Sequence, residues 1–236
     1  MAALLIAIFG IGGQLEDNLR TLREQINEQP ASGDLVIVEI DAQSLQRLDN
    51  WPWPRSRYAN AIERLNAAGV SQIAFDIDFS AHSVTEEDAA LAEAIAQSEA
   101  TVILPTFRQF SSAQSNEFIE SLPIDALAEH AFLASINVHP DSNGQLNDYS
   151  YGTVTGGKPR PSLASMLSGS AGKVETSFAI NQAIDPASIP RISFANLIEG
   201  KTAQVPLEGK KIIIGATAIE LGDRYPIRSH LSLIHI

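Results

Sequence analysis

The fold is decided by residues 33–80, GDLVIVEIDAQSLQRLDNWPWPRSRYANAIERLNAAGVSQIAFDIDFS. Two short apolar runs with branched side chains, at 35–40 and 71–79, have the pattern of buried parallel strands. Between them, residues 56–68 place apolar side chains at helical spacing, and Gly69 follows as a helix stop. The stretch therefore predicts a strand, a crossover helix and a second strand parallel to the first.

The rest of the chain continues this alternation of short apolar strands and helical segments. Further strands are expected at 101–104, 132–138, 149–155, 177–180 and 211–214, and further helices at 85–97, 124–129, 162–167 and 192–198. The alternation predicts a single α/β domain with a central, largely parallel sheet and helices on both faces. The carboxyl ends of parallel strands share one edge of such a sheet, and open α/β folds usually bind ligands there.

The composition is that of a globular, acidic protein. With 236 residues, of which 44% are hydrophobic and 19% charged, the chain can bury a full core in one domain. The formal net charge of −12 argues against nucleic acid or an anionic membrane as a partner of the domain body, so an acidic ligand would need a local exception. Because the chain has no cysteine, disulfides, thiolate metal sites and a cysteine nucleophile are excluded.

Carboxylates follow both strands of the central unit. Asp41 ends the first apolar run, and Asp76 and Asp78 belong to the second. Close carboxylates repel each other unless they share a cation, an arginine or a proton. Three interpretations stay open, namely a divalent metal site with Asp41, an ion pair with Arg55 or Arg224, and capping of a helix or turn. Pairing and capping are the commoner uses of aspartate.

The segment WPWPR at 51–55 is expected to be stiff, because each proline keeps the residue before it extended. Trp53 and Arg55 could form an aromatic and cationic wall of a ligand pocket. We favour the alternative, in which the segment plugs the end of the sheet and Arg55 pairs with Asp41 or Asp76.

A second glycine-rich segment, GATAIELGD at 215–223, follows the last expected strand. Its glycines allow the close backbone approach and positive φ angles that anion-binding turns use. The segment lacks the lysine and Ser/Thr placement of a phosphate-binding P-loop, so a tight turn is the default interpretation.

An apolar strand followed by Asp-x-Asp is also similar to the first motif of haloacid-dehalogenase-like phosphatases, which work with magnesium. In that alternative Asp76 is the nucleophile and Asp78 the acid and base. The motif is incomplete, because the later acidic pair would begin at Asp223 and would need an acid where Ile227 stands.

An ordered series of segments resembles the CHASE type 2 domain, the extracytoplasmic sensory module of bacterial cyclases, histidine kinases and related receptors. The segments are IDAQSL (40–45), WPWPR (51–55), AFDIDFS (74–80), DAALAEAI (88–95), HPDSNG (139–144), PSLA (161–164), RISFANLI (191–198) and GKKIIIGATAIELGDRYP (209–226). The resemblance extends from about residue 15 to 227. It implies a ligand sensor at the cell membrane, on the extracytoplasmic side, with no catalytic residues or cofactor of its own, in a parent protein that is itself an enzyme.

The same resemblance implies a division of the chain. Residues 1–13 are too short for a membrane span of roughly 20 residues and are expected to be the remnant of a transmembrane helix or signal anchor. Residues 14–32 would be a membrane-proximal helix and linker, 33–228 the sensor domain, and 229–236 a truncated or foreign tail. The expected partners are an unknown small molecule or environmental signal and the membrane on either side of the domain. We also allow for a homodimer and expect no nucleic acid.

The expected ligand-binding residues lie along the strand edge, and no catalytic residue or metal ligand is expected. They are Asp41, Trp53, Arg55, Asp76, Asp78, Gly215 and Asp223. Asn147 and Asp148 stand where the family usually has basic residues, which weakens the expectation of an anion-binding role there.

Overall fold

The computed structural model describes residues 26–48, 51–110, 117–141, 144–202 and 205–218, together with the backbone of 225–226 and 231–232. The expected membrane remnant, most of the membrane-proximal helix, Asp223, Arg224, Ile227 and most of the tail lie outside the described residues. Within the described ranges, no helix has both the length and the apolar character that a membrane crossing requires.

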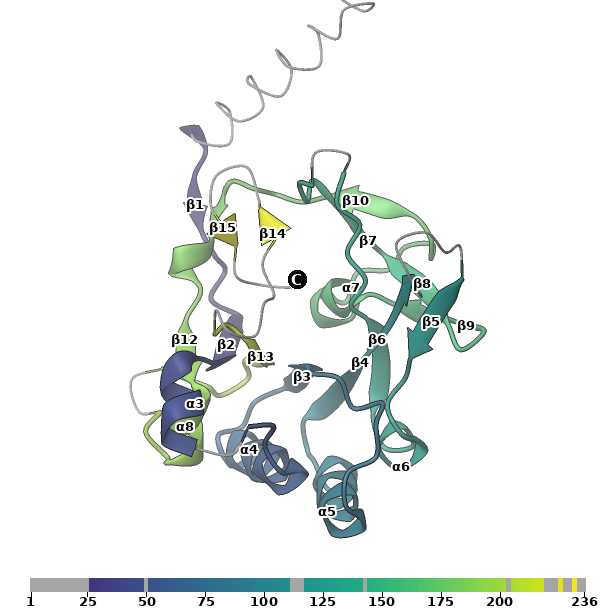
Figure 1. The fold of residues 1–236 in the computed structure, drawn as a ribbon. Helices are drawn as coiled ribbons and strands as arrows, with labels where there is room; N and C mark the ends of the chain where they lie inside the picture. The colour runs from purple at the N-terminus through teal and green to yellow at the C-terminus, as the bar shows by residue number, and fades with distance from the viewer. Residues whose placement is uncertain are drawn as a thin grey trace, which may run out of the picture.

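A seven-stranded sheet forms the centre of the molecule (Figure 1). Its strands are β2 (Leu35–Ile40), β3 (Gln72–Asp76), β4 (Thr101–Phe110), β5 (Phe118–Ser121), β6 (Phe132–Ser135), β12 (Arg191–Ser193) and β13 (Lys211–Ala216). The order is β12-β2-β13-β3-β4-β5, with β6 also paired to β4. Every pairing is parallel except that of β4 with β5, so the predicted, largely parallel sheet is confirmed.

The predicted central unit is present, but its two strands are not neighbours. The crossover helix is α4 (Arg55–Ala67), and Gly69 follows it with a φ of 73°. Strand β13 pairs with β2 on one side and with β3 on the other. The ends of β2 and β3 are therefore separated by two strand spacings, roughly 10 Å.

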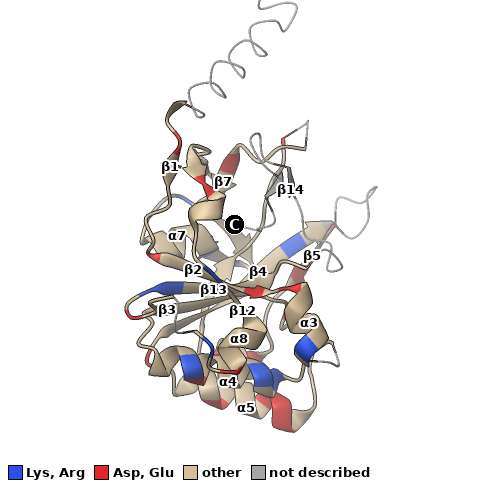
Figure 2. Ribbon diagram, turned by 90° about the vertical axis from the view of Figure 1, so that its left-hand side faces the viewer, with Lys and Arg blue, Asp and Glu red and all other residues tan. Residues whose placement is uncertain are grey.

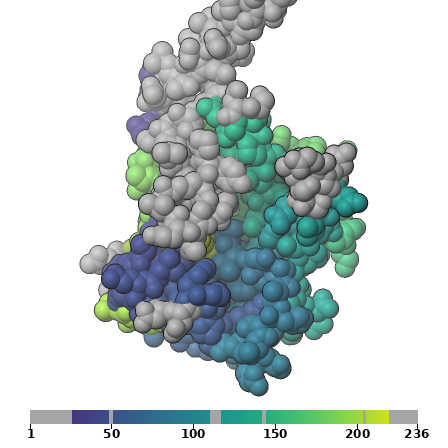
Figure 3. Space-filling model, viewed as in Figure 1, coloured from purple at the N-terminus to yellow at the C-terminus, as the bar shows by residue number. Residues whose placement is uncertain are grey.

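One face of the sheet is covered by most of the helices. They are α3 (Ala42–Leu48), α4, α5 (Thr85–Ala96), α6 (Asp125–Ala128) and α8 (Phe194–Ile198). Fully buried side chains such as Ile62, Leu65 and Leu91 pack there against Val38 and Ile214 of the sheet. Each such side chain contributes roughly 1.5–3 kcal/mol to stability. In Figure 3 the blue colours of residues from about 40 to 100 occupy the lower part of the molecule, where α3, α4 and α5 lie, and some purple lies higher up on the left, at β1.

The opposite face is covered by α7 (Leu163–Ser168) and by two small antiparallel sheets. Leu163 and Leu167 of α7 pack against Ala74, Ile103 and Ile213 of the central sheet. The small sheets pair β7 (Asp148–Ser150) with β10 (Ser177–Ala179) and β8 (Gly152–Thr155) with β9 (Lys158–Pro161). Helices therefore lie on both faces, as predicted, although the second face has more β-structure than the sequence pattern indicated.

Three local predictions need correction. The run at 149–155 forms two strands in different sheets, since β7 pairs with β10 and β8 pairs with β9. The run at 71–79 ends as a strand at Asp76. Residues 192–198 begin as strand β12 and become helical at Phe194.

The remaining elements are short. They are β1 (Gln29–Pro30), paired with β11 (Ile184–Asp185), the 3-10 helix η1 (Pro186–Ser188), and β14 (Tyr225–Pro226), paired with β15 (Leu231–Ser232). Figure 2 shows Lys and Arg as well as Asp and Glu on the helices of the lower layer, so this layer carries both signs of charge.

Candidate ligand site at the carboxyl edge of the sheet

Asp41, the first predicted site residue, caps a helix. It follows β2, and its Oδ1 accepts hydrogen bonds from the N–H of Ser44, at 2.7 Å, and from the hydroxyl of Ser193, at 3.0 Å. The buried Ser44 hydroxyl in turn accepts from the N–H of Ala195 at 3.0 Å. These bonds tie the start of α3 to the start of α8. Of the interpretations considered for Asp41, capping is the one that these contacts match.

Asp78 lies in the turn after β3 and its side chain is engaged locally. Its Oδ1 accepts the N–H of Ser80 at 2.8 Å, as in other aspartate-stabilised turns. Phe75 and Phe79, which flank the acidic pair, both lie in the helix-covered core. Because the strand ends at Asp76, the two carboxylates belong to different structural elements.

Arg55 is buried, but its acidic partner differs from the one expected. The guanidinium donates to Oδ1 of Asp88 at 2.6 Å and to the carbonyls of Phe79 and Ala81. Asp88 lies in the first turns of α5 and also accepts the N–H of Ser83. The predicted pairing of Arg55 with Asp41 or Asp76 is therefore wrong, because α4 packs against α5 and brings Asp88 closer.

Trp53 is also part of the helix-covered core. Its ring is 5% exposed and stacks on Phe194, with centroids 4.9 Å apart and planes at 20°. The rings of Trp51 and Trp53 form a T-shaped pair with centroids 5.1 Å apart. The guanidinium carbon of Arg57 lies 5.8 Å from the ring centroid of Trp53. These contacts fit the plug interpretation of the segment at 51–55. Ligand binding by Trp53 and Arg55 stays a prediction.

Asp76 and Gly215 are brought together at the ends of β3 and β13, and Glu39 of β2 lies on the other side of Gly215 in the same register. In-register positions on parallel strands point to the same face, which here is the face that carries α7. A Cβ on Gly215 would lie 3.3 Å from the Cβ of Asp76, so the Asp76 side chain packs closely over this glycine. Glu39 accepts a hydrogen bond from Arg191 at 2.6 Å.

Tyr149 of β7 is a residue that the sequence analysis did not single out. It is 3% exposed, yet its hydroxyl has no hydrogen-bond partner among the described residues. Burial raises the pKa of Tyr149 above its ordinary value of 10.0, and the negative charge of Asp76 raises it further. The phenol therefore stays protonated near neutral pH and keeps its proton available for donation.

A buried hydroxyl without a partner costs about 1–3 kcal/mol, so a group of this kind is a candidate for binding a ligand or a water molecule. Asp76, Gly215 and Tyr149, with Glu39 alongside, thus form the candidate site. The sequence pattern gave no signal for Tyr149, because the weak apolar run around it suggested a strand without indicating what it packs against. Within the described part of the chain, no group of three or more His, Asp or Glu side chains is arranged to hold a metal ion.

Comparison with known proteins gives one match. A family model described as the CHASE2 domain matches residues 1–228, a range that includes every described element through β14. No curated protein and no solved structure matches the chain.

Proposed function

Since the chain belongs to the CHASE2 domain family, whose members are sensory domains of signal-transduction receptors, we propose that it is the extracytoplasmic ligand-sensing domain of a membrane-bound receptor. The receptor's output would be a cyclase, a histidine kinase or a related activity. The domain itself would bind a signal without turning it over.

The main support for this location is the Tyr149 hydroxyl, which has no hydrogen-bond partner in the described part of the chain and is affected by the negative charge of Asp76. A carboxylate accepts hydrogen bonds, and a neutral phenol can donate one. Asp76 packs over Gly215, where any larger side chain would crowd the carboxylate. We therefore assign this site a small ligand rich in hydrogen-bond donors, such as an amine or a hydroxyl-bearing molecule, with one acceptor for Tyr149.

The phosphatase alternative uses the same Asp76 and is the weaker of the two. Its acid and base would be Asp78, whose Oδ1 is already bound to the N–H of Ser80 in a turn. The family assignment also favours sensing, since CHASE2 domains are sensors. The alternative remains testable, because it requires magnesium-dependent turnover.

The ligand assignment is tested by measuring melting temperatures of the purified chain with a panel of small amines, amino acids and sugars. A compound that binds the folded state raises the melting temperature by mass action. The expected result is a compound that stabilises the wild-type chain and loses most of that effect in Asp76→Asn and Tyr149→Phe. A ligand whose effect is unchanged in both variants would place binding elsewhere.

The cellular location is tested with a reporter fusion at residue 100 of the parent protein. An extracytoplasmic reporter signal is expected. A cytoplasmic signal would contradict the receptor topology and would favour the phosphatase alternative.

A further inference from the structure

Arg108 lies on the part of β4 that extends past its pairing with β3, and several groups contact it there. β3 pairs with residues 101–103 of β4, whereas Arg108 pairs with β5. The side-chain amide of Asn137 clamps the Arg108 backbone, accepting its N–H at 3.1 Å and donating to its carbonyl at 2.6 Å. The guanidinium carbon lies 5.1 Å from the ring centroid of Phe118. The Arg108 backbone is therefore held by Asn137, and the guanidinium lies against an aromatic ring.

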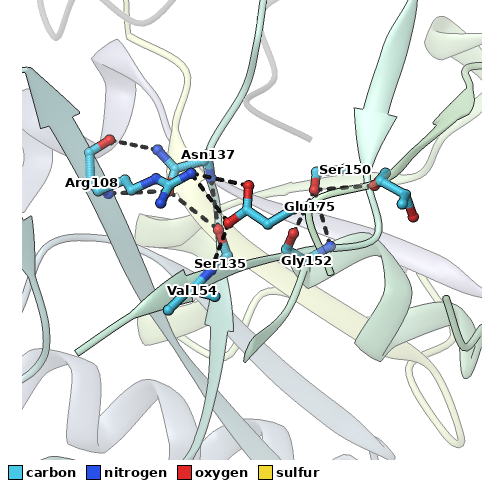
Figure 4. Close-up of polar contacts among 8 residues, drawn as sticks. Arg108, Ser135, Asn137, Ser150, Gly152, Val154 and Glu175 are labelled. Atoms are coloured by element: carbon cyan, nitrogen blue, oxygen red, sulfur yellow. Dashed lines mark hydrogen bonds and ion pairs between the residues drawn. The ribbon is translucent and has the colours of Figure 1, made fainter. Parts of the chain in front are cut away.

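Three hydrogen bonds converge on the carboxylate of Glu175 (Figure 4). Arg108 donates to both oxygens, at 3.1 and 3.2 Å, and the N–H of Val154 in β8 donates to Oε1 at 3.1 Å. The Glu175 side chain is 47% exposed and that of Arg108 24% exposed, so the contact is open to solvent. Both arginine contacts come from the single nitrogen Nη2, and this cation together with a backbone N–H favours a carboxylate through charge-assisted hydrogen bonds.

The backbone of Glu175 is in an unfavourable conformation for its residue type. Its φ is 62°, and no other non-glycine residue in the described ranges has a positive φ. The residue occupies the third position of the turn 173–176, which the N–H of Thr176 closes on the carbonyl of Lys173 at 3.2 Å. Glycine or asparagine usually fills a turn position with positive φ. Strain of this kind is concentrated at binding sites and switch segments.

We propose that Arg108 and the N–H of Val154 form a binding site for small carboxylate ligands, which the Glu175 side chain occupies while no ligand is bound. In a chain with a net charge of −12, this is the local exception at which an anion can bind. Glu175 competes as a tethered carboxylate with a high effective concentration, which lowers the apparent affinity for a free carboxylate. When a ligand displaces the Glu175 side chain, the strained turn 173–176 is free to relax. Binding is therefore coupled to a conformational change in the segment between α7 and β10. The site shares no residue with the one at Asp76 and does not depend on it.

The test compares succinate binding by the folded, purified chain and its variants, with sodium chloride at matched ionic strength as the reference. Glu175→Asn removes the competing carboxylate and puts a residue suited to positive φ into the turn. We expect this variant to bind succinate at least about tenfold more tightly than the wild type, with a larger rise in melting temperature. Arg108→Gln in the same background is expected to remove the binding.

Glu120→Gln is the matched control. Glu120 faces Arg108 across the β4–β5 pair and accepts the N–H of Gly156, so its neutralisation changes the net charge by the same amount near the same arginine. It should strengthen succinate binding far less than Glu175→Asn does. An equal effect of both variants, or no succinate effect in a folded Glu175→Asn chain, would overturn the proposal. If Glu175→Asn does not fold, Glu175→Gly supplies the same comparison, because glycine also tolerates the turn.

Discussion

The guanidinium of Arg55 and the carboxylate of Asp88 form a buried ion pair that joins the first turns of α4 and α5. Their side chains are 8% and 11% exposed. Removing one member of such a pair leaves the other buried without compensation, which typically costs 3–5 kcal/mol. The two helices cover the same face of the sheet, so this pair affects the whole helix-covered core.

Asp88→Asn is therefore expected to lower the free energy of unfolding by about 3 kcal/mol or more. Urea unfolding followed by circular dichroism measures the change. Glu86→Gln is the control, since Glu86 is an exposed acid in the same turn of α5 and its substitution should change stability by about 0.5 kcal/mol or less. Equal effects of the two substitutions would show that the ion pair contributes little.

Tyr149→Phe is expected to stabilise the ligand-free domain, which is unusual for a substitution in a core. The change deletes a buried hydroxyl for which the described ranges supply no hydrogen-bond partner, and it keeps the ring against Phe178. The free energy of unfolding should rise by about 1 kcal/mol, the lower end of the cost of an unsatisfied buried group. Tyr151→Phe, in the neighbouring residue, should leave stability nearly unchanged. A loss of stability in Tyr149→Phe would mean that the hydroxyl is satisfied in solution.

The stability of the domain is expected to fall as the pH rises above about 10. Burial raises the pKa of Tyr58 above its ordinary value of 10.0, an effect that the nearby charges of Arg57 and Arg55 partly offset, and burial also raises the pKa of Tyr149. The folded state then keeps protons that the unfolded chain loses, so the stabilisation is complete below pH 10 and decreases above it. Urea unfolding at a series of pH values measures the slope. Tyr149→Phe should make this decrease shallower, and an unchanged slope in that variant would argue against a raised pKa at Tyr149.

Asp76→Asn separates the two candidate functions. A sensor is expected to show no magnesium-dependent hydrolysis of p-nitrophenyl phosphate with either the wild-type or the variant chain. The variant should instead weaken the response to any stabilising ligand, because the carboxylate next to Gly215 is lost. Hydrolysis that requires magnesium and disappears in Asp76→Asn would support the phosphatase alternative and would refute the assignment as a sensor without catalytic residues of its own.

The parts of the structure that the sequence predicted are those governed by local patterns. The helix at 55–67 with its stop at Gly69, and α7 between Ser162 and Gly169, follow from apolar spacing and from capping residues within a few positions. The parallel sheet follows from the alternation of strands and helices. These signals need no knowledge of distant parts of the chain.

The parts that were missed depend on contacts between distant residues. Local pattern does not give the order of strands in a sheet, so the position of β13 between β2 and β3 was not predicted. The partner of Arg55 lies on the next helix, and the role of Glu175 depends on Arg108, Val154 and a turn that glycine or asparagine would normally occupy. In each case the sequence shows the residue type but does not show which distant residues contact it in the fold.

The position of β13 also has a consequence for the order in which the domain can assemble during synthesis. Leu35 pairs with Lys211, so the sheet gains its middle strand only when almost the whole described chain has been made. Until then β2 and β3 lack a shared neighbour, and their unpaired edges are open to pairing with other chains. Such long-range pairing slows folding and leaves the nascent protein exposed to aggregation for longer, which gives chaperones a specific interval in which to act.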